Sequence, residues 1–322
     1  MESFMPNSAD PTTAVLNTLT GEMVARAAAA DFRSFYRDDS PLKVIISVEN
    51  CHIAAFRSSG RSSRIVISPE MANSPVSSAE DFFFHLLIIC HEIAHLVNKH
   101  EKASFESVED GSDVEFWADF YSGKALITLL TYGERTKEFL RRFFKIGILP
   151  GQLAYAAPDL TPTVPFYAIL DSLGISMARL VKTVYQDSNR YPPKILRAGL
   201  ICNGVTSALR HELVNPDPIW YFSVIRRLLL LSPEISHLSK IRPNDVVVEK
   251  ERIERIRSVH RNIQGKSYQI TPGLKPQFAN HLHTRFTHSD EEIANMQAER
   301  KADIQAMFDK YPNGIESNLD NP

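Results

Sequence analysis

Hydrophobic and polar positions divide the chain into a short β-rich segment and a longer series of helical ones. Between residues 41 and 68, three short runs rich in β-branched residues alternate with polar turns. This pattern predicts a small sheet with strands near residues 43–48, 52–56 and 64–68. Residues 79–99 contain no Gly or Pro and are apolar on nearly every side. They predict a helix that runs through the centre of a domain rather than along its surface.

Helical patterns occupy most of the remaining chain. An N-terminal helix is expected over residues 14–36, and a polar loop at 104–111 precedes a second central helix at 112–131. Later helices, separated by Pro-bearing breaks, are expected at residues 134–145, 167–187, 193–212, 218–231, 244–261 and 290–310. The predicted fold class is therefore α+β: a small antiparallel sheet packed on a helix pair, followed by a mainly α-helical C-terminal half.

The first central helix carries two histidines one turn apart, His91 and His95, with Glu92 between them. Side chains at positions i and i+4 lie on the same face of a helix, so both imidazoles can converge on one tetrahedral Zn²⁺ ion. Polar side chains within so apolar a helix need partners, because an unpaired buried carboxylate is costly. The H-E-x-x-H motif thus predicts a zinc site at which Glu92 acts as general base.

A catalytic zinc site also needs a third protein ligand, and the following helix offers Glu115. Aromatic residues flank Glu115 on a helix that must bury an apolar face, and Asp119 lies one turn further along the same side. Asp119 is expected to accept the outer N–H of a ligating histidine. Three nearby carboxylates could instead supply the ligand or be solvated loop charges: Glu109, Asp110 and Asp113.

The remaining histidines are not expected to bind metal. His281, His283 and His288 have no carboxylate or cysteine at ligand spacing, so a second metal cluster is not predicted. His100 follows His91 by nine residues and, on a continuous helix, would point to the opposite side. His100 is therefore expected to stand alone. The same is expected of five other histidines: His52, His85, His211, His237 and His260.

The paired motifs H-E-x-x-H and E-x-x-x-D resemble those of the gluzincin metallopeptidases, and a sheet followed by two metal-binding helices is the layout of small gluzincin cores. Among gluzincins, the chain is most similar to the Lit family of phage-exclusion peptidases. A later segment from Tyr191 to Arg197, Y-P-P-K-I-L-R, is similar to the H-P-P-x-x-x-R element of the Lit and HtpX-type peptidases. Tyr191 stands where those families have histidine. The resemblance covers roughly residues 41–197.

This resemblance implies a zinc-dependent endopeptidase that cleaves a specific intracellular protein, such as a translation factor or regulator, in bacterial defence against phage. It also implies that an edge strand, for which residues 64–68 are the candidate, pairs with an extended substrate. Tyr191 and Arg197 are the favoured candidates for the donor that stabilises the developing oxyanion. Tyr185 and His211 are further candidates for that role.

Three parts of the chain are expected on this basis. Residues 1–150 would hold the N-terminal helix and the peptidase core, residues 151–312 a helical region that completes the cleft and binds the partner, and residues 313–322 a flexible tail. Two other functions remain open. One is a regulator resembling the ImmA/IrrE family, which acts on a repressor or partner. The other is a catalytically silent interaction protein in which the metal only joins helices.

Composition and charge narrow the class of protein. With 36 Lys and Arg against 38 Asp and Glu, the formal charge is −2, so no basic field is available to recruit nucleic acid. The sequence contains neither a secretory signal pattern nor an apolar run of about 20 residues that would span a membrane. Three cysteines, an odd number without metal-ligand spacing, indicate a reducing compartment. We expect a cytoplasmic protein that binds neither nucleic acid nor membrane.

Overall fold

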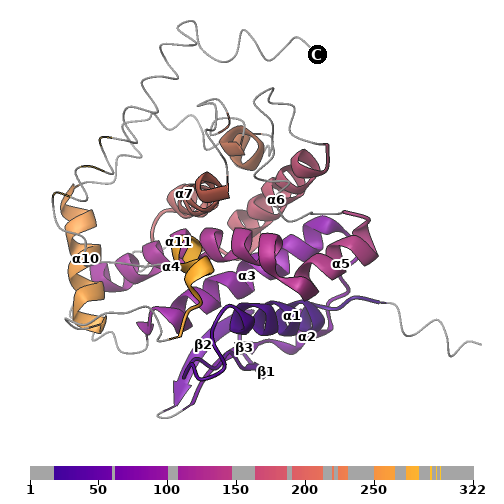
Figure 1. Ribbon diagram of the computed structural model, residues 1–322, viewed down its shortest axis with the longest axis horizontal. Coiled ribbons are helices and arrows are strands. Elements are labelled where there is room, and N and C mark those ends of the chain that lie inside the picture. The colour runs from indigo at the N-terminus through magenta and orange to yellow at the C-terminus, as the bar shows by residue number, and fades with distance from the viewer. Residues whose placement is uncertain are drawn as a thin grey trace, which may run out of the picture.

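The computed structural model confirms an α+β fold in which helices dominate and one small sheet is present (Figure 1). It describes residues 18–59, 62–100, 108–146, 164–186, 191–212, 220, 224–230, 250–264, 273–282, 291, 295 and 298. The expected helix at 290–310 and the expected tail at 313–322 therefore lie outside the described residues, apart from the three isolated positions.

The sheet has three strands, β1 (Ile46–Val48), β2 (Ala54–Ser59) and β3 (Ser62–Ile67), in the order β1-β3-β2. β2 pairs with β3 in the antiparallel sense, whereas β1 runs parallel to β3. Two expectations are therefore wrong: the sheet is mixed rather than antiparallel, and the strand near residues 64–68 is central rather than at the edge.

The burial of β3 agrees with its central place. Ile65, Val66 and Ile67 are all fully buried. A continuous apolar run of this kind is typical of a strand that is covered on both faces, as parallel strands usually are. β2 pairs with one edge of β3, and β1 pairs with the other edge. β2 and β1 are thus the two edges of the sheet among the described residues.

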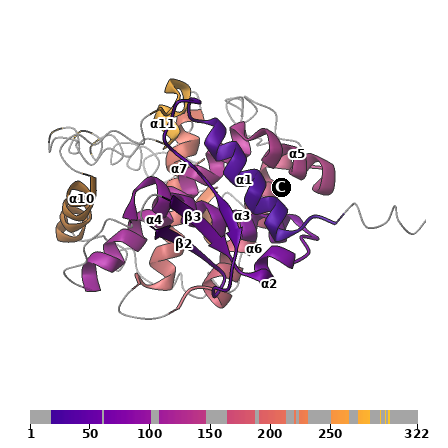
Figure 2. The same ribbon diagram turned by 90° about the horizontal axis from the view of Figure 1, so that it is seen from below.

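Helix α3 (Ala79–Val97) is the centre of the fold, as predicted. The hydroxyl of Ser78 accepts a hydrogen bond from the Asp81 N–H at its start, and Glu80 and Asp81 place negative charge in its first turn. Nearly all of its side chains are buried. Figure 2 shows the sheet lying across α3 with α1 (Gly21–Ser34) packed beside it.

The other helices form layers around α3. Figure 1 shows α4 (Val108–Tyr132) beside α3, with α6 (Val164–Thr183) and α7 (Lys194–Glu212) on the side away from the sheet. The remaining elements are α2 (Pro69–Asn73), α5 (Glu134–Phe144), the π-helix η4 (Arg226–Leu230), α10 (Lys250–Gln264), the 3₁₀-helix η7 (Pro276–Phe278) and α11 (Ala279–Leu282). One hydrophobic core extends through these layers and contains residues from both halves of the chain.

Helices α4 and α7 approach each other unusually closely. A Cβ atom on Gly204 would lie 2.0 Å from the Phe120 carbonyl oxygen, and one on Gly123 would lie 2.3 Å from the Ile201 carbonyl oxygen. Two helix backbones can meet at this distance only where both contact positions lack a side chain. This contact holds α7 directly against the helix that carries Glu115.

Two further features concern the cysteines and the apolar segments of the described residues. Cys51, Cys90 and Cys202 are all free, and the latter two are buried in the core. No described helix combines the length and the apolar character that crossing a membrane would require.

Candidate metal centre

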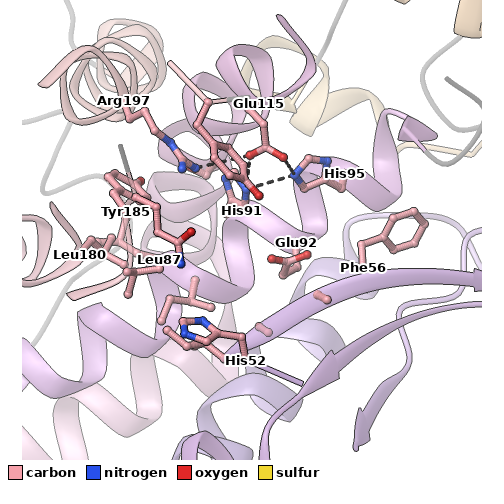
Figure 3. Close-up of a pocket in the computed structure, with 18 of the residues that line it drawn as sticks. His52, Phe56, Leu87, His91, Glu92, His95, Glu115, Leu180, Tyr185 and Arg197 are labelled. Atoms are coloured by element: carbon pink, nitrogen blue, oxygen red, sulfur yellow. Dashed lines mark hydrogen bonds and ion pairs between the residues drawn. The ribbon is translucent and has the colours of Figure 1, made fainter. Parts of the chain in front are cut away.

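His91 and His95 of α3 face Glu115 of α4, and together they outline a metal-sized triangle (Figure 3). His91 Nε2 lies 3.1 Å from His95 Nε2 and 3.3 Å from Glu115 Oε2, and His95 Nε2 lies 3.6 Å from Glu115 Oε1. Ligand atoms about 2.0–2.1 Å from a tetrahedral zinc ion are about 3.3 Å apart. The three side chains therefore fit a zinc ion, as the motif predicts.

The charges around this triangle favour a cation. Burial by itself lowers the pKa of His91, but the carboxylates of Asp119 and Glu115 raise it to about 10. Burial raises the pKa of Glu115, yet the neighbouring imidazoles and Arg197 lower it to about 2. Two ionised carboxylates thus lie beside the imidazoles, with one guanidinium as their fixed counterion.

Asp119 lies beside the outer ring nitrogen of His91, a place from which a carboxylate can orient a ligand. Its Oδ1 is 3.0 Å from His91 Nδ1, a close contact that is not aligned as a hydrogen bond. Arg197 donates from Nε to Oδ2 over 2.6 Å and from Nη2 to Oδ1 over 3.1 Å, and the Tyr185 hydroxyl lies 3.4 Å from Oδ1. Although burial raises the pKa of Asp119, Arg197 and His91 lower it below its usual value.

Arg197 is buried between two aromatic rings rather than free in the cavity. Its guanidinium lies 3.8 Å from the centre of the Tyr185 ring and 5.3 Å from that of Tyr191. Its Nη2 also lies 3.5 Å from Glu115 Oε2. Because the guanidinium already contacts Asp119 and Glu115, the geometry favours a role for Arg197 in positioning these carboxylates.

Tyr191, partly buried, lines the cavity and stays the candidate donor to a developing oxyanion. Tyr185, the other tyrosine considered from the sequence, is directed to Asp119 instead. The side chain of His211 lies outside the described residues.

Glu92 lies beside the triangle, between α3 and strand β2 (Figure 3). It is 9% exposed, and burial raises its pKa to about 7, although the charge of His91 and the backbone N–H of Phe56 act in the opposite direction. A carboxyl group with a pKa near neutrality can both take up and release a proton. This is the property that the predicted general base requires.

The cavity in front of the triangle has a volume of about 530 Å³. One wall is apolar, and it is formed by side chains of α3, of α6 and of the residue that follows α6: Leu87, Ile88, Leu180 and Val184. The other wall is strand β2. Just before β2, the Ile53 carbonyl accepts a hydrogen bond from the Ser68 N–H, so in an antiparallel pair the backbone groups of Ala54 and Phe56 point away from β3. The edge strand beside the site is therefore β2.

Two histidines expected to stand alone, His100 and His260, contact the site. His95 Nδ1 lies 2.8 Å from His100 Nδ1, and His100 Nε2 lies 3.1 Å from His260 Nε2. The expectation for His100 is wrong because α3 ends at Val97 and Lys99 adopts a left-handed conformation with φ 55°, which turns the chain back. Burial lowers the pKa of His95 and of His260 to about 4, and lowers that of His100 as well.

The remaining candidates are not seen to contribute to the triangle. Asp113 forms ion pairs with Arg252 and Arg255 of α10, so it is not directed toward the triangle. The side chains of Glu109 and Asp110 lie outside the described residues, as do His283 and His288. His281 contacts the hydroxyl of Tyr132, and His52 lines the cavity.

Comparisons of the chain with protein-family models, with curated proteins and with solved structures found no match. The function is therefore inferred from the motifs and from the geometry of the site.

Proposed function

We propose that this protein is a zinc-dependent endopeptidase of gluzincin type, which hydrolyses a peptide bond in a specific intracellular protein in bacterial defence against phage. The observation that carries this proposal is the triangle formed by His91, His95 and Glu115, with its zinc-compatible spacing. It lies at a cavity that Glu92 also lines. The phage-defence setting and a target such as a translation factor derive from the resemblance to Lit peptidases.

The chemistry follows from the placement of these residues. His91, His95 and Glu115 would hold the zinc ion, which would supply Lewis acidity to acidify water and polarise a carbonyl group. Glu92 takes the proton of the attacking water and returns it to the leaving amine, since its pKa of about 7 suits both transfers. The Tyr191 hydroxyl is the candidate donor to the carbonyl oxygen as negative charge develops on it.

The walls of the cavity support a polypeptide substrate. The outer edge of β2 offers the backbone groups of Ala54, which can pair with an extended chain. The apolar wall opposite can receive a hydrophobic side chain of that substrate. Substrate backbone and side chain would thus be held on either side of the triangle.

A metal that only joins helices is usually enclosed by four protein ligands, whereas a catalytic zinc keeps one position open. Among the described residues, three supply ligand atoms to this cluster. The ligand set therefore favours the enzyme over the structural role. A regulator of the ImmA/IrrE type would use the same metal centre. It would differ from the proposed peptidase in its target, which would be a repressor.

The test is a comparison of the wild type with Glu92→Gln. We expect both purified proteins to hold about one zinc ion per chain. New protein N-termini, identified by mass spectrometry, should appear only in cells that express the wild type. An active Glu92→Gln variant would exclude Glu92 as the base, and a wild type that binds no zinc would refute the proposal. Cleavage of a transcriptional repressor would favour the regulatory function.

A further inference from the structure

We propose that His100 and His260 form a relay that fixes the tautomer of His95, and thereby control how strongly His95 binds the metal. The inference rests on the proposed function only in taking His95 as a metal ligand. The three imidazoles are joined in a row by contacts of 2.8 Å and 3.1 Å, and the row ends at a backbone carbonyl, since His260 Nδ1 lies 2.7 Å from the Ile256 oxygen.

The carbonyl determines where every proton in the row lies. A carbonyl oxygen only accepts, so His260 Nδ1 must carry a proton and its Nε2, in a neutral ring, is an acceptor. His100 Nε2 must then donate to His260, which leaves His100 Nδ1 as an acceptor. His95 Nδ1 must in turn donate to His100. The lone pair of His95 is therefore on Nε2, the atom that faces Glu115 and the metal position.

Other proton arrangements are disfavoured by the same contacts. A doubly protonated ring in the row would direct an N–H group at another N–H group across about 3 Å. His100 is 5% exposed and His260 is fully buried, so solvent has little access to these contacts. The N–H···N contacts also raise the basicity of His95, the effect expected of an outer partner of a metal-binding histidine.

The relay depends on the docking of α10 against α4. Arg252 and Arg255 of α10 contact Asp113, which is fully buried, and Arg252 donates to the Ser112 hydroxyl over 2.8 Å. The Trp117 ring lies 5.8 Å from that of His260. A helix far along the chain thus supplies a group that acts on the metal centre through His100.

The first experiment measures zinc affinity by competition with a chelator. We expect His100→Phe to weaken zinc binding about ten- to hundredfold, the usual effect of losing an outer partner. His260→Phe should weaken it less, and the double variant should bind no more weakly than His100→Phe, because His260 acts through His100. His281→Phe, which removes a buried imidazole at a distance from the site, should bind as the wild type does. Unchanged affinity in both single variants, or additive effects in the double variant, would overturn the relay.

The second experiment needs neither zinc nor activity, and it uses the wild type, so it is independent of how the variants fold. Long-range ¹⁵N–¹H spectra of the histidine rings should show His95 and His260 protonated at Nδ1 and His100 at Nε2. His100 protonated at Nδ1 would overturn the relay and leave the peptidase proposal standing. The expected tautomers in a protein that binds zinc but cleaves no protein would support the relay and refute the peptidase instead.

Discussion

Arg197 Nε lies 2.6 Å from Asp119 Oδ2, and this buried pair connects α7 to the back of the metal centre. Asp119 contacts His91 on its other side. The guanidinium therefore holds the carboxylate that lies beside His91, a candidate metal ligand. A residue from the C-terminal half thus takes part in building a site whose candidate ligands come from α3 and α4.

Arg197→Met should destabilise the protein by about 3–5 kcal/mol, because it leaves the carboxylate of Asp119 buried without its cation. Zinc affinity should fall as well, since Asp119 would no longer be held behind His91. Arg197→Lys keeps the charge but loses the paired hydrogen bonds, so an intermediate effect is expected. Urea denaturation and chelator competition measure the two effects. A stable Arg197→Met variant with normal zinc affinity but no activity would instead assign Arg197 to the substrate.

The contact between α4 and α7 gives a second prediction. Gly204→Ala places a methyl group 2.0 Å from the Phe120 carbonyl oxygen. The helices must then separate, which should cost about 1–3 kcal/mol and lower zinc affinity by displacing Arg197. Gly199→Ala on the same helix meets nothing within 4 Å and should be neutral or stabilise by about 0.5–1 kcal/mol. Equal stability of the two variants, measured by thermal denaturation, would contradict this account.

The parts of the fold that local signals determine were predictable from the sequence. The helix expected at 79–99 is observed as Ala79–Val97, and that expected at 193–212 as Lys194–Glu212. Two local signals define such helices without reference to the rest of the chain. One is a hydroxyl or carboxylate group at the first turn, and the other is a long apolar pattern. Helical spacing also places His91 and His95 on one face of α3. Glu115 was predicted to join them because a catalytic zinc site needs a third ligand and the next helix offers one.

Relationships between distant segments were not predictable in this way. Strand β3 has the same β-branched composition whether it lies at the centre or at the edge, so only its pairing partners decide between the two. His100 and His260 are 160 positions apart, and neither has a local signal for their contact. The left-handed turn at Lys99, on which that contact depends, involves a residue type that rarely adopts this conformation.

Strand β2 allows the proposed mode of substrate binding to be tested. Ala54→Pro removes an N–H that points away from β3, so the fold and zinc affinity should be retained. Cleavage of the target should fall at least about fivefold, because one main-chain hydrogen bond to the substrate is worth about 1 kcal/mol. Ala55→Pro removes a bond to β3 instead and should destabilise the protein by about 1–3 kcal/mol. Normal cleavage by a folded Ala54→Pro variant would rule out pairing of the substrate at this edge.

Lys124 of α4 should make the stability of the protein depend on alkaline pH. Its side chain is 7% exposed, and burial lowers its pKa from 10.5 to about 8. Between these two values the unfolded chain binds more protons than the folded one, so the free energy of unfolding should rise with pH in this window. The shift corresponds to roughly 3 kcal/mol, since one pKa unit is worth about 1.4 kcal/mol.

Lys124→Met should therefore be more stable than the wild type at pH 7, by up to about 3 kcal/mol, and the difference should shrink as pH rises to about 10. Urea denaturation of both proteins across this range measures it. Lys182→Met, on the exposed side of α6, controls for the general effect of removing one positive charge. If the difference between wild type and Lys124→Met stays constant with pH, the ammonium group keeps its ordinary proton affinity in the folded protein, and burial does not govern its charge.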